Sequence, residues 1–295
     1  MSTTVQELLD AGVHFGHLKR KWNPSMAPYI FMEKDGIHII DLQKTMVKLD
    51  EAALAVKQIA KSGRKILFVA TKKQAKDIVA DRVKQVSMPY VTERWPGGML
   101  TNFPTIRKAV KKMTSIDKMA SDGTFDNLSK REKLQIARQR AKLEKNLGSI
   151  ADLTRLPAAM FIVDITKEHI AVREARRLNI PIFAMVDTNS DPKLVDFPIP
   201  ANDDASKSIS LIVDIIAKSI QEGLDERKME REKEMAVPEK KGKKELVDEE
   251  TEEEDEEVLE SKAKSLASKK PIPMKSAAKK GAKIDVVLDE EEEIE

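Results

Sequence analysis

The sequence predicts an α/β protein built on a Rossmann- or flavodoxin-like parallel sheet, with an antiparallel helical (coiled-coil) hairpin inserted into it. Two stretches of the chain alternate continuous apolar runs with amphipathic helical segments, and such runs are typical of strands covered on both faces. A basic segment without strand signals separates the two stretches, and a highly charged segment follows the second one. We therefore expect one core domain with two additions.

The first part of the chain predicts a helix, a loop, a β-hairpin and a second helix. Apolar residues within 5–9 share one helical face, and Gly12 ends that helix. After the loop, apolar runs at 29–32 and 37–40 flank a turn that contains glycine, as in a hairpin. Asp41 then caps a long helix with one apolar stripe.

Two β-α-β units form the predicted sheet, because helix and apolar strand alternate in both. The expected elements are a strand at 66–70, a helix to about 86 and a strand at 88–91, then a strand at 158–164, a helix at 168–178 and a strand at 182–187, closed by a strand near 198–200 and a helix from 204 to about 224.

The segment between the two units predicts the hairpin. Pro104 starts one helix, Ser-Asp-Gly at 121–123 breaks it, and a capping box at 129–132 starts a second. Residues 101–150 carry 12 Lys and Arg against 5 Asp and Glu. An ordinary solvated helix face is less one-sided, so the imbalance favours nucleic acid. The exposed cations expected to contact it are Lys108, Lys111 and Lys112.

Two loops combine cations with a tryptophan. In the first, Lys19, Arg20 and Lys21 precede Trp22 and Asn23, which suits phosphate contacts and one stacking contact.

The second loop joins the first half of the sheet to the hairpin. Gly97 and Gly98 permit close backbone approach, and charge, stacking and hydrogen bonds are offered beside them by Arg94, Trp95 and Asn102. A turn that leads into a helix explains the same residues, and both tryptophans can either stack on bases or anchor their loops.

The sequence gives little evidence of a metal site or a catalytic site. His14 and His17 have no further His or Cys nearby, whereas zinc needs three or four protein ligands. Several acidic residues near strand ends offer a divalent-ion site, although helix caps and turns are commoner uses of aspartate: Asp164, Asp187, Asp191, Asp203 and Asp204. G-x-G-x-x-G, G-x-x-x-x-G-K-[ST], H-E-x-x-H and G-x-S-x-G are absent. We expect no metal, no cofactor and no small-molecule substrate.

Composition restricts the class of protein. The chain of 295 residues has no cysteine and no apolar run long enough for a membrane span, so we expect a cytoplasmic protein without a membrane partner. Residues 236–295 carry 12 Lys and Arg against 19 Asp and Glu, which leaves 40 against 31 for residues 1–235. A basic body with an acidic tail favours a nucleic-acid partner, and the tail itself is expected to be a disordered interaction arm.

Five segments together resemble one family, in the family's order: residues 11–17 (AGVHFGH), 20–24 (RKWNP), 37–42 (IHIIDL), 94–102 (RWPGGMLTN) and 186–192 (VDTNSDP). Over residues 5–225 the chain resembles the bacterial small-subunit ribosomal protein two family. The resemblance implies a Rossmann-like sheet, no catalytic activity and binding to small-subunit ribosomal RNA beside neighbouring small-subunit proteins. It also implies help in recruiting ribosomal protein one.

The expected organisation follows from these observations. Residues 1–103 form the first half of the α/β domain, 104–150 the basic hairpin and 151–225 the second half, before a helical extension and charged tail at 226–295. Two alternatives remain open, namely a nucleotide-binding enzyme on a doubly wound sheet and a coiled-coil adaptor.

Overall fold

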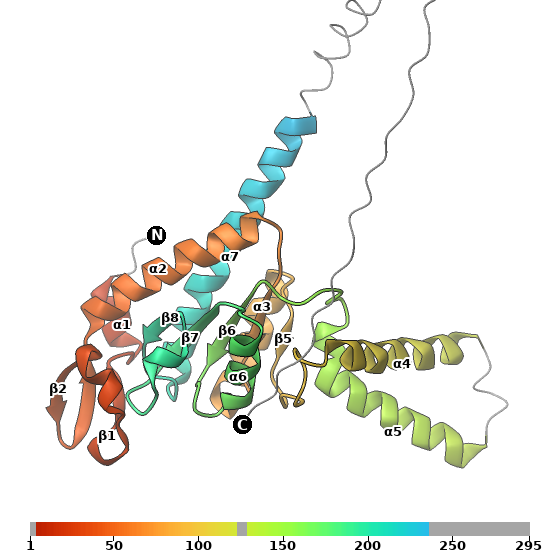
Figure 1. The fold of residues 1–295 in the computed structure, drawn as a ribbon, viewed down its shortest axis with the longest axis horizontal. Helices are drawn as coiled ribbons and strands as arrows, with labels where there is room; N and C mark the ends of the chain where they lie inside the picture. Colours follow the sequence, from red (N-terminus) through yellow and green to blue (C-terminus); the bar gives the residue numbers. More distant parts are fainter. Residues whose placement is uncertain (1–3, 123–128, 236–295) are drawn as a thin grey trace, which may run out of the picture. The chain divides into compact units, whose positions relative to one another are not determined.

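A computed structural model describes residues 4–122 and 129–235, whose fold is drawn in Figure 1. The chain divides into a unit of residues 1–233 and a unit of residues 234–295. The first unit holds both sheets and all the interactions discussed below. The tail expected at residues 236–295 lies outside the described residues.

Five parallel strands form the main sheet, in the order β5-β4-β6-β7-β8. They are β4 (Ile66–Val69), β5 (Tyr90–Val91), β6 (Ala159–Val163), β7 (Ile182–Val186) and β8 (Phe197–Pro200). Phe68 of β4 lies opposite Phe161 of β6, and Phe161 lies opposite Phe183 of β7, so aromatic residues line up across the sheet. The parallel sheet and the two expected β-α-β units are confirmed.

Alternate side chains of the strands point to opposite faces of this sheet, and helices cover the apolar side chains on each face. Ile66 and Phe68 belong to one buried cluster with α2 (Leu42–Lys61), α3 (Lys73–Gln85) and α7 (Ser206–Met235). Leu67 and Val69 belong to the other cluster, with α6 (His169–Arg177). Both faces are apolar, which explains why the strands read as continuous apolar runs.

A second, antiparallel sheet of order β1-β3-β2 lies beside the main one and follows α1 (Val5–Asp10). Strands β2 (Ile30–Lys34) and β3 (Ile37–Ile40) form the expected hairpin. The expectation that the segment after Gly12 is entirely a loop was wrong, because β1 (Phe15–Leu18) pairs with β3. Two 3₁₀ helices follow β1, namely η1 (Lys19–Lys21) and η2 (Pro24–Tyr29).

The basic segment between the β-α-β units forms α4 (Phe103–Ser121) and α5 (Lys130–Leu147), which lie side by side. Arg140 of α5 forms an ion pair with Asp117 of α4. The predicted capping box at Ser129 is present. The break expected at 121–123 begins where α4 ends, at Ser121, and residues 123–128 lie outside the described residues.

Helix α7 continues beyond residue 224 into the expected helical extension, where charged pairs extend its contact with α2. Lys57 of α2 lies 3.2 Å from the Glu222 carboxylate and 2.8 Å from that of Glu226, and Lys61 pairs with Glu230. Within residues 4–122 and 129–235, no helix is long and apolar enough to cross a membrane.

Candidate nucleic-acid interface

The basic loop, residues 19–23, presents cations to solvent. Lys19, Arg20 and Lys21 form η1, and all three side chains are exposed. Lys19 Nζ lies 2.8 Å from the carboxylate of Glu33 on β2, so its charge already has a partner. In the described part of the chain, Arg20 and Lys21 form no ion pair. Their charges are therefore free to meet phosphate.

The basic loop is fixed from behind by the segment after β7. The backbone N–H of Asn23 donates to the Thr188 carbonyl at 2.8 Å, and the N–H of His17 donates to Thr188 Oγ1 at 2.8 Å. Gly16 makes this approach possible, because a Cβ there would lie 2.6 Å from Thr188 Cγ2. The Asn23 side chain accepts from the N–H of Ser25 and starts η2. Three of the sequence segments quoted above, residues 11–17, 20–24 and 186–192, thus meet here.

The exposure of Trp22 lies between that of an exposed residue that stacks on a base and that of a buried residue that anchors a loop. Its side chain is 36% exposed, and its ring lies 5.1 Å from the buried His38 ring, centroid to centroid. One part of the indole is held by the small sheet, while the rest lies next to the cations.

The glycine loop, residues 94–102, is organised around one carboxylate. Glu174, a buried residue of α6, accepts hydrogen bonds from the Trp95 indole at 3.1 Å and the Gly98 N–H at 2.7 Å. Its second oxygen accepts from the N–H groups of Leu100 and Thr101 at 2.9 and 3.1 Å. Burial alone would raise the pKa of Glu174, but these hydrogen bonds together lower it below its ordinary value. Trp95 is 7% exposed and anchors the loop.

The remaining predicted residues of this region face solvent. Arg94 and Gly97 are exposed, and a Cβ at Gly97 would meet nothing within 4 Å. Gly98 has a φ of +83°, which L side chains rarely adopt. Asn102 precedes α4 and accepts a hydrogen bond from Thr105 Oγ1. Farther along α4, three lysines are exposed: Lys108, Lys111 and Lys112.

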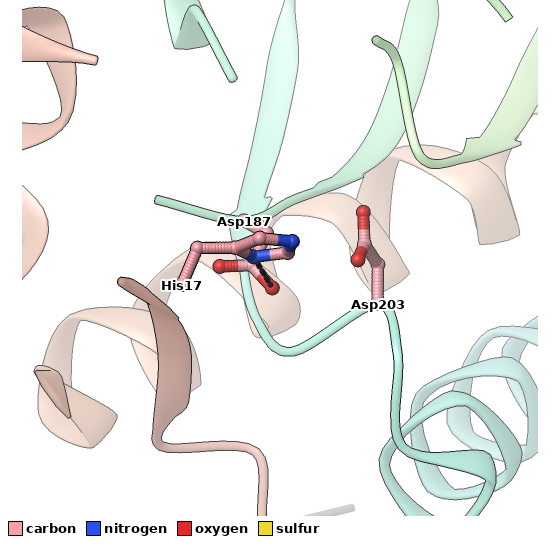
Figure 2. Close-up of side chains that lie close together, drawn as sticks. All are labelled: His17, Asp187 and Asp203. Carbon is pink, nitrogen blue, oxygen red and sulfur yellow. Dashed lines mark ion pairs between the residues drawn. The ribbon is translucent and has the colours of Figure 1, made fainter. Parts of the chain in front are cut away.

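A cluster of charged side chains lies behind the basic loop, at the carboxyl ends of β7 and β8 (Figure 2). His17 Nδ1 lies 3.1 Å from Asp187 Oδ2, and its Nε2 lies 3.4 Å from the exposed Asp204 carboxylate. The hydrogen bond to Asp187 raises the pKa of His17. Asp203 is fully buried, and burial together with Asp187 and Asp164 raises the pKa of Asp203 to about 7.

Lys72 supplies the positive charge of this cluster. Its Nζ lies 2.7 Å from the Asp203 carboxylate, 2.6 Å from that of Asp204 and 3.5 Å from that of Asp164. Burial alone would lower the pKa of Lys72, but the three carboxylates together raise it. An ion-pair network thus occupies the edge of the sheet where nucleotide-binding folds place phosphate.

The same cluster offers ligands of the type that a divalent cation needs. One atom each from His17, Asp187 and Asp203 lie within 4.8 Å of one another. Asp203 Oδ2 is buried and accepts no hydrogen bond from a described residue, and the buried Asp187 Oδ2 faces only His17 among the described residues. One nitrogen and two carboxylate oxygens are ligand types that zinc binds. His14, the other histidine considered above, is not part of the group.

The aspartates near strand ends divide between two uses. Asp164 accepts from the backbone N–H groups of Thr166 and Lys167, and Asp191 starts a 3₁₀ turn by accepting from the N–H of Lys193, so both act as the expected caps.

Sequence reasoning missed two residues that position the candidate interface, namely Thr188 and Glu174. Thr188 lies within a segment that resembles the family, but no sequence pattern pairs it with Gly16. Glu174 could have been found, because it lies on the same helical face as the buried Ala171 and Ala175. A carboxylate on an apolar face requires buried donors.

Comparisons with known proteins agree with the fold and with the five segments. A family model described as Ribosomal protein S2 matches residues 8–223. Three similar proteins are each named small ribosomal subunit protein uS2. The protein of Phocaeicola vulgatus is 73% identical over 229 residues, covering 78% of this chain and 82% of its own length. That of Parabacteroides distasonis is 72% identical over 225 residues, covering 76% and 81%.

The protein of Flavobacterium johnsoniae is 70% identical over 232 residues, covering 79% of this chain and 91% of its own length. The matches agree with the family resemblance inferred for residues 5–225. The chain therefore belongs to the ribosomal protein S2 family, a family of structural ribosomal proteins rather than enzymes.

Proposed function

We propose that this chain is a structural constituent of the small ribosomal subunit that binds small-subunit ribosomal RNA through three surfaces. These are the basic loop, the glycine loop and the exposed lysines of α4. The observation that carries the proposal is that Arg20, Lys21 and Arg94 are exposed, form no ion pair with a described residue and stand on loops fixed from behind. Fixed cations lose little entropy when they meet phosphate.

The domain organisation given above is part of the proposal. The two halves of the α/β domain would present the loops, and α4 and α5, as a coiled-coil hairpin, would extend the basic surface. Ribosome-bound function places the chain in the cytoplasm, beside neighbouring small-subunit proteins.

Incorporation into subunits tests the RNA contact. The full chain with Arg20→Ala, Lys21→Ala and Arg94→Ala is expressed beside wild-type protein, and both are quantified in small subunits separated by sedimentation. We expect the triple variant to be depleted at moderate salt. A control with the same loss of charge removes the exposed cations Lys73, Lys207 and Lys218, which lie outside the three surfaces. Equal incorporation of both triple variants would contradict the proposal.

We further propose that the small antiparallel sheet helps recruit ribosomal protein one. Its β2 strand exposes apolar side chains to solvent, with Phe31 71% and Met32 48% exposed, and Phe15 and Leu18 of β1 are exposed as well. Exposed apolar groups of this kind mark protein contacts. Subunits that carry Phe31→Ser should retain less ribosomal protein one than wild-type subunits at equal content of this chain. Unchanged retention would count against this surface.

A further inference from the structure

A cleft of about 530 Å³ opens at the carboxyl ends of β5, β4 and β6. From β4 the chain continues to β5 on one side, and from β6 it continues to β7 on the other. The cleft therefore lies where the winding direction of the sheet reverses, which is where open parallel sheets bind ligands. Its volume falls in the range of about 300–1,000 Å³ that is typical of small-ligand sites.

Two cations line the cleft, and the negative charge of Glu168 acts on one of them, Lys167, without a direct ion pair. Arg94 and Lys167 line it, and neither forms an ion pair within residues 4–122 and 129–235. Lys167 Nζ is held 3.1 Å from the Thr71 carbonyl, which fixes its position. The cleft also contains Glu93, but that carboxylate already pairs with Lys76 and Lys145. The uncompensated charge is positive and suits a phosphate.

Glu168 contributes a buried carboxylate with one unused oxygen. It is 4% exposed and lines the cleft beside Thr71. The N–H and the hydroxyl of Thr71 both donate to Oε1, and no described residue donates to Oε2. Burial raises the pKa of Glu168. Oε2 is not among the buried oxygens that lack a partner, so it is accessible and can accept a hydrogen bond from a hydroxyl or an amino group in the cleft.

Apolar surface completes the cleft. Pro96 and the buried Trp95 form part of its wall, and Ile170, which is 44% exposed, lies on the side of α6. Apolar side chains of this kind can cover the flat face of a sugar or base.

We propose that this cleft binds one nucleotide, with its phosphate on Arg94 and Lys167 and a ribose hydroxyl or base amino group on Glu168. The proposal rests on the proposed contact of Arg94 with RNA and makes it more specific. The nucleotide is either free or an unpaired residue of an RNA chain, because both present the same phosphate and sugar. No bond is made or broken.

Calorimetric titration of the full chain distinguishes the two sources. The probes are the four nucleoside 5′-monophosphates and single-stranded tetranucleotides of RNA. The variants are Glu168→Gln, which keeps the size of the side chain, and Arg94→Ala, whose exposed side chain can be removed without loss of packing. Lys207→Ala is the control, since this exposed lysine of α7 is not among the cleft residues.

We expect one nucleotide bound per chain, with affinity reduced about tenfold or more in both cleft variants and unchanged in the control. Binding of monophosphates supports a free nucleotide as the ligand, and binding of tetranucleotides alone supports an RNA residue. The proposal is overturned if neither probe binds at about 1 mM, or if both cleft variants bind as wild type does.

Incorporation into subunits separates this proposal from the general one. Glu168→Gln is not part of the triple variant described above. If this variant loses nucleotide binding but is incorporated normally into subunits, RNA binding by the loops does not depend on the cleft. Normal incorporation of the triple variant, by contrast, removes the general proposal whatever the cleft binds.

Discussion

The basic loop and the glycine loop both place a tryptophan next to a cation, yet the fold uses the two loops in opposite ways. In the basic loop the backbone is fixed by Thr188 and the side chains of Arg20 and Lys21 project into solvent. In the glycine loop a side chain, Trp95, is buried and the backbone at Gly97 is left open. Residue type therefore does not reveal whether a loop presents side chains or backbone to solvent. The residue that anchors the loop, Thr188 in one case and Glu174 in the other, does reveal it.

Removing each tryptophan is the strongest test of this contrast. Trp95→Ala should lower the free energy of unfolding by about 3–5 kcal/mol, because it opens a cavity and removes a donor from Glu174. Trp22→Ala should lower it by less than about 1 kcal/mol while weakening RNA binding. Urea denaturation of both variants measures the difference. Similar losses of stability would show that both tryptophans are anchors.

The second-largest effect on stability is expected for Glu174, whose carboxylate binds the backbone of the glycine loop. Glu174→Gln should lower the free energy of unfolding by about 2–3 kcal/mol at pH 7, because an amide nitrogen faces backbone donors. The native pKa of Glu174 lies below its ordinary value, so its contribution is complete above about pH 5.

That contribution disappears as the pH falls through the native pKa, and the gap between variant and wild type should then narrow. Denaturation curves between pH 7 and acid pH measure this. A gap that is constant or widens on acidification would contradict the role given to the carboxylate. Glu232→Gln, at an exposed position of α7, is the matched control.

The two glycines give a smaller but cleaner comparison. Gly16→Ala should lower the free energy of unfolding by about 1–3 kcal/mol, since its Cβ would lie 2.6 Å from Thr188 Cγ2 and 3.0 Å from the His38 carbonyl oxygen. Gly97→Ala should change it by no more than about 0.5 kcal/mol, because the space is open. If RNA approaches this backbone, Gly97→Ala will still weaken RNA binding. Thermal unfolding and RNA titration on the same samples separate the two effects.

Within the basic loop, neighbouring lysines should differ. Lys21→Ala should reduce the magnitude of the salt dependence of RNA affinity by about one unit of slope, because it removes one phosphate contact. Lys19→Ala should have a smaller effect, since Glu33 already neutralises this lysine. Equal slopes for the two variants would show that the pair with Glu33 breaks on binding.

The sequence predicted the sheet and its helices because local patterns determine them. Apolar runs at β4, β6 and β7 predict buried strands, and the capping box at Ser129 predicts the start of α5. The positions of exposed cations followed from charge patterns. The anchors did not, because Glu174 and Gly98 are far apart in sequence and only tertiary packing brings them together. Strand β1 was missed as well, because it is a strand through its pairing with β3, which the local sequence does not reveal.

The contact between His17 and Thr188 has a consequence for the order of folding. These residues are separated by 171 positions, so this anchor of the basic loop forms only after most of the chain has been synthesised. Contacts of such long range form late, since the intervening chain must first be brought together. A nascent chain therefore exposes Arg20 and Lys21 early but acquires the arrangement that presents them only after β7 has joined the sheet. The complete arrangement that presents these cations therefore depends on the topology of the chain.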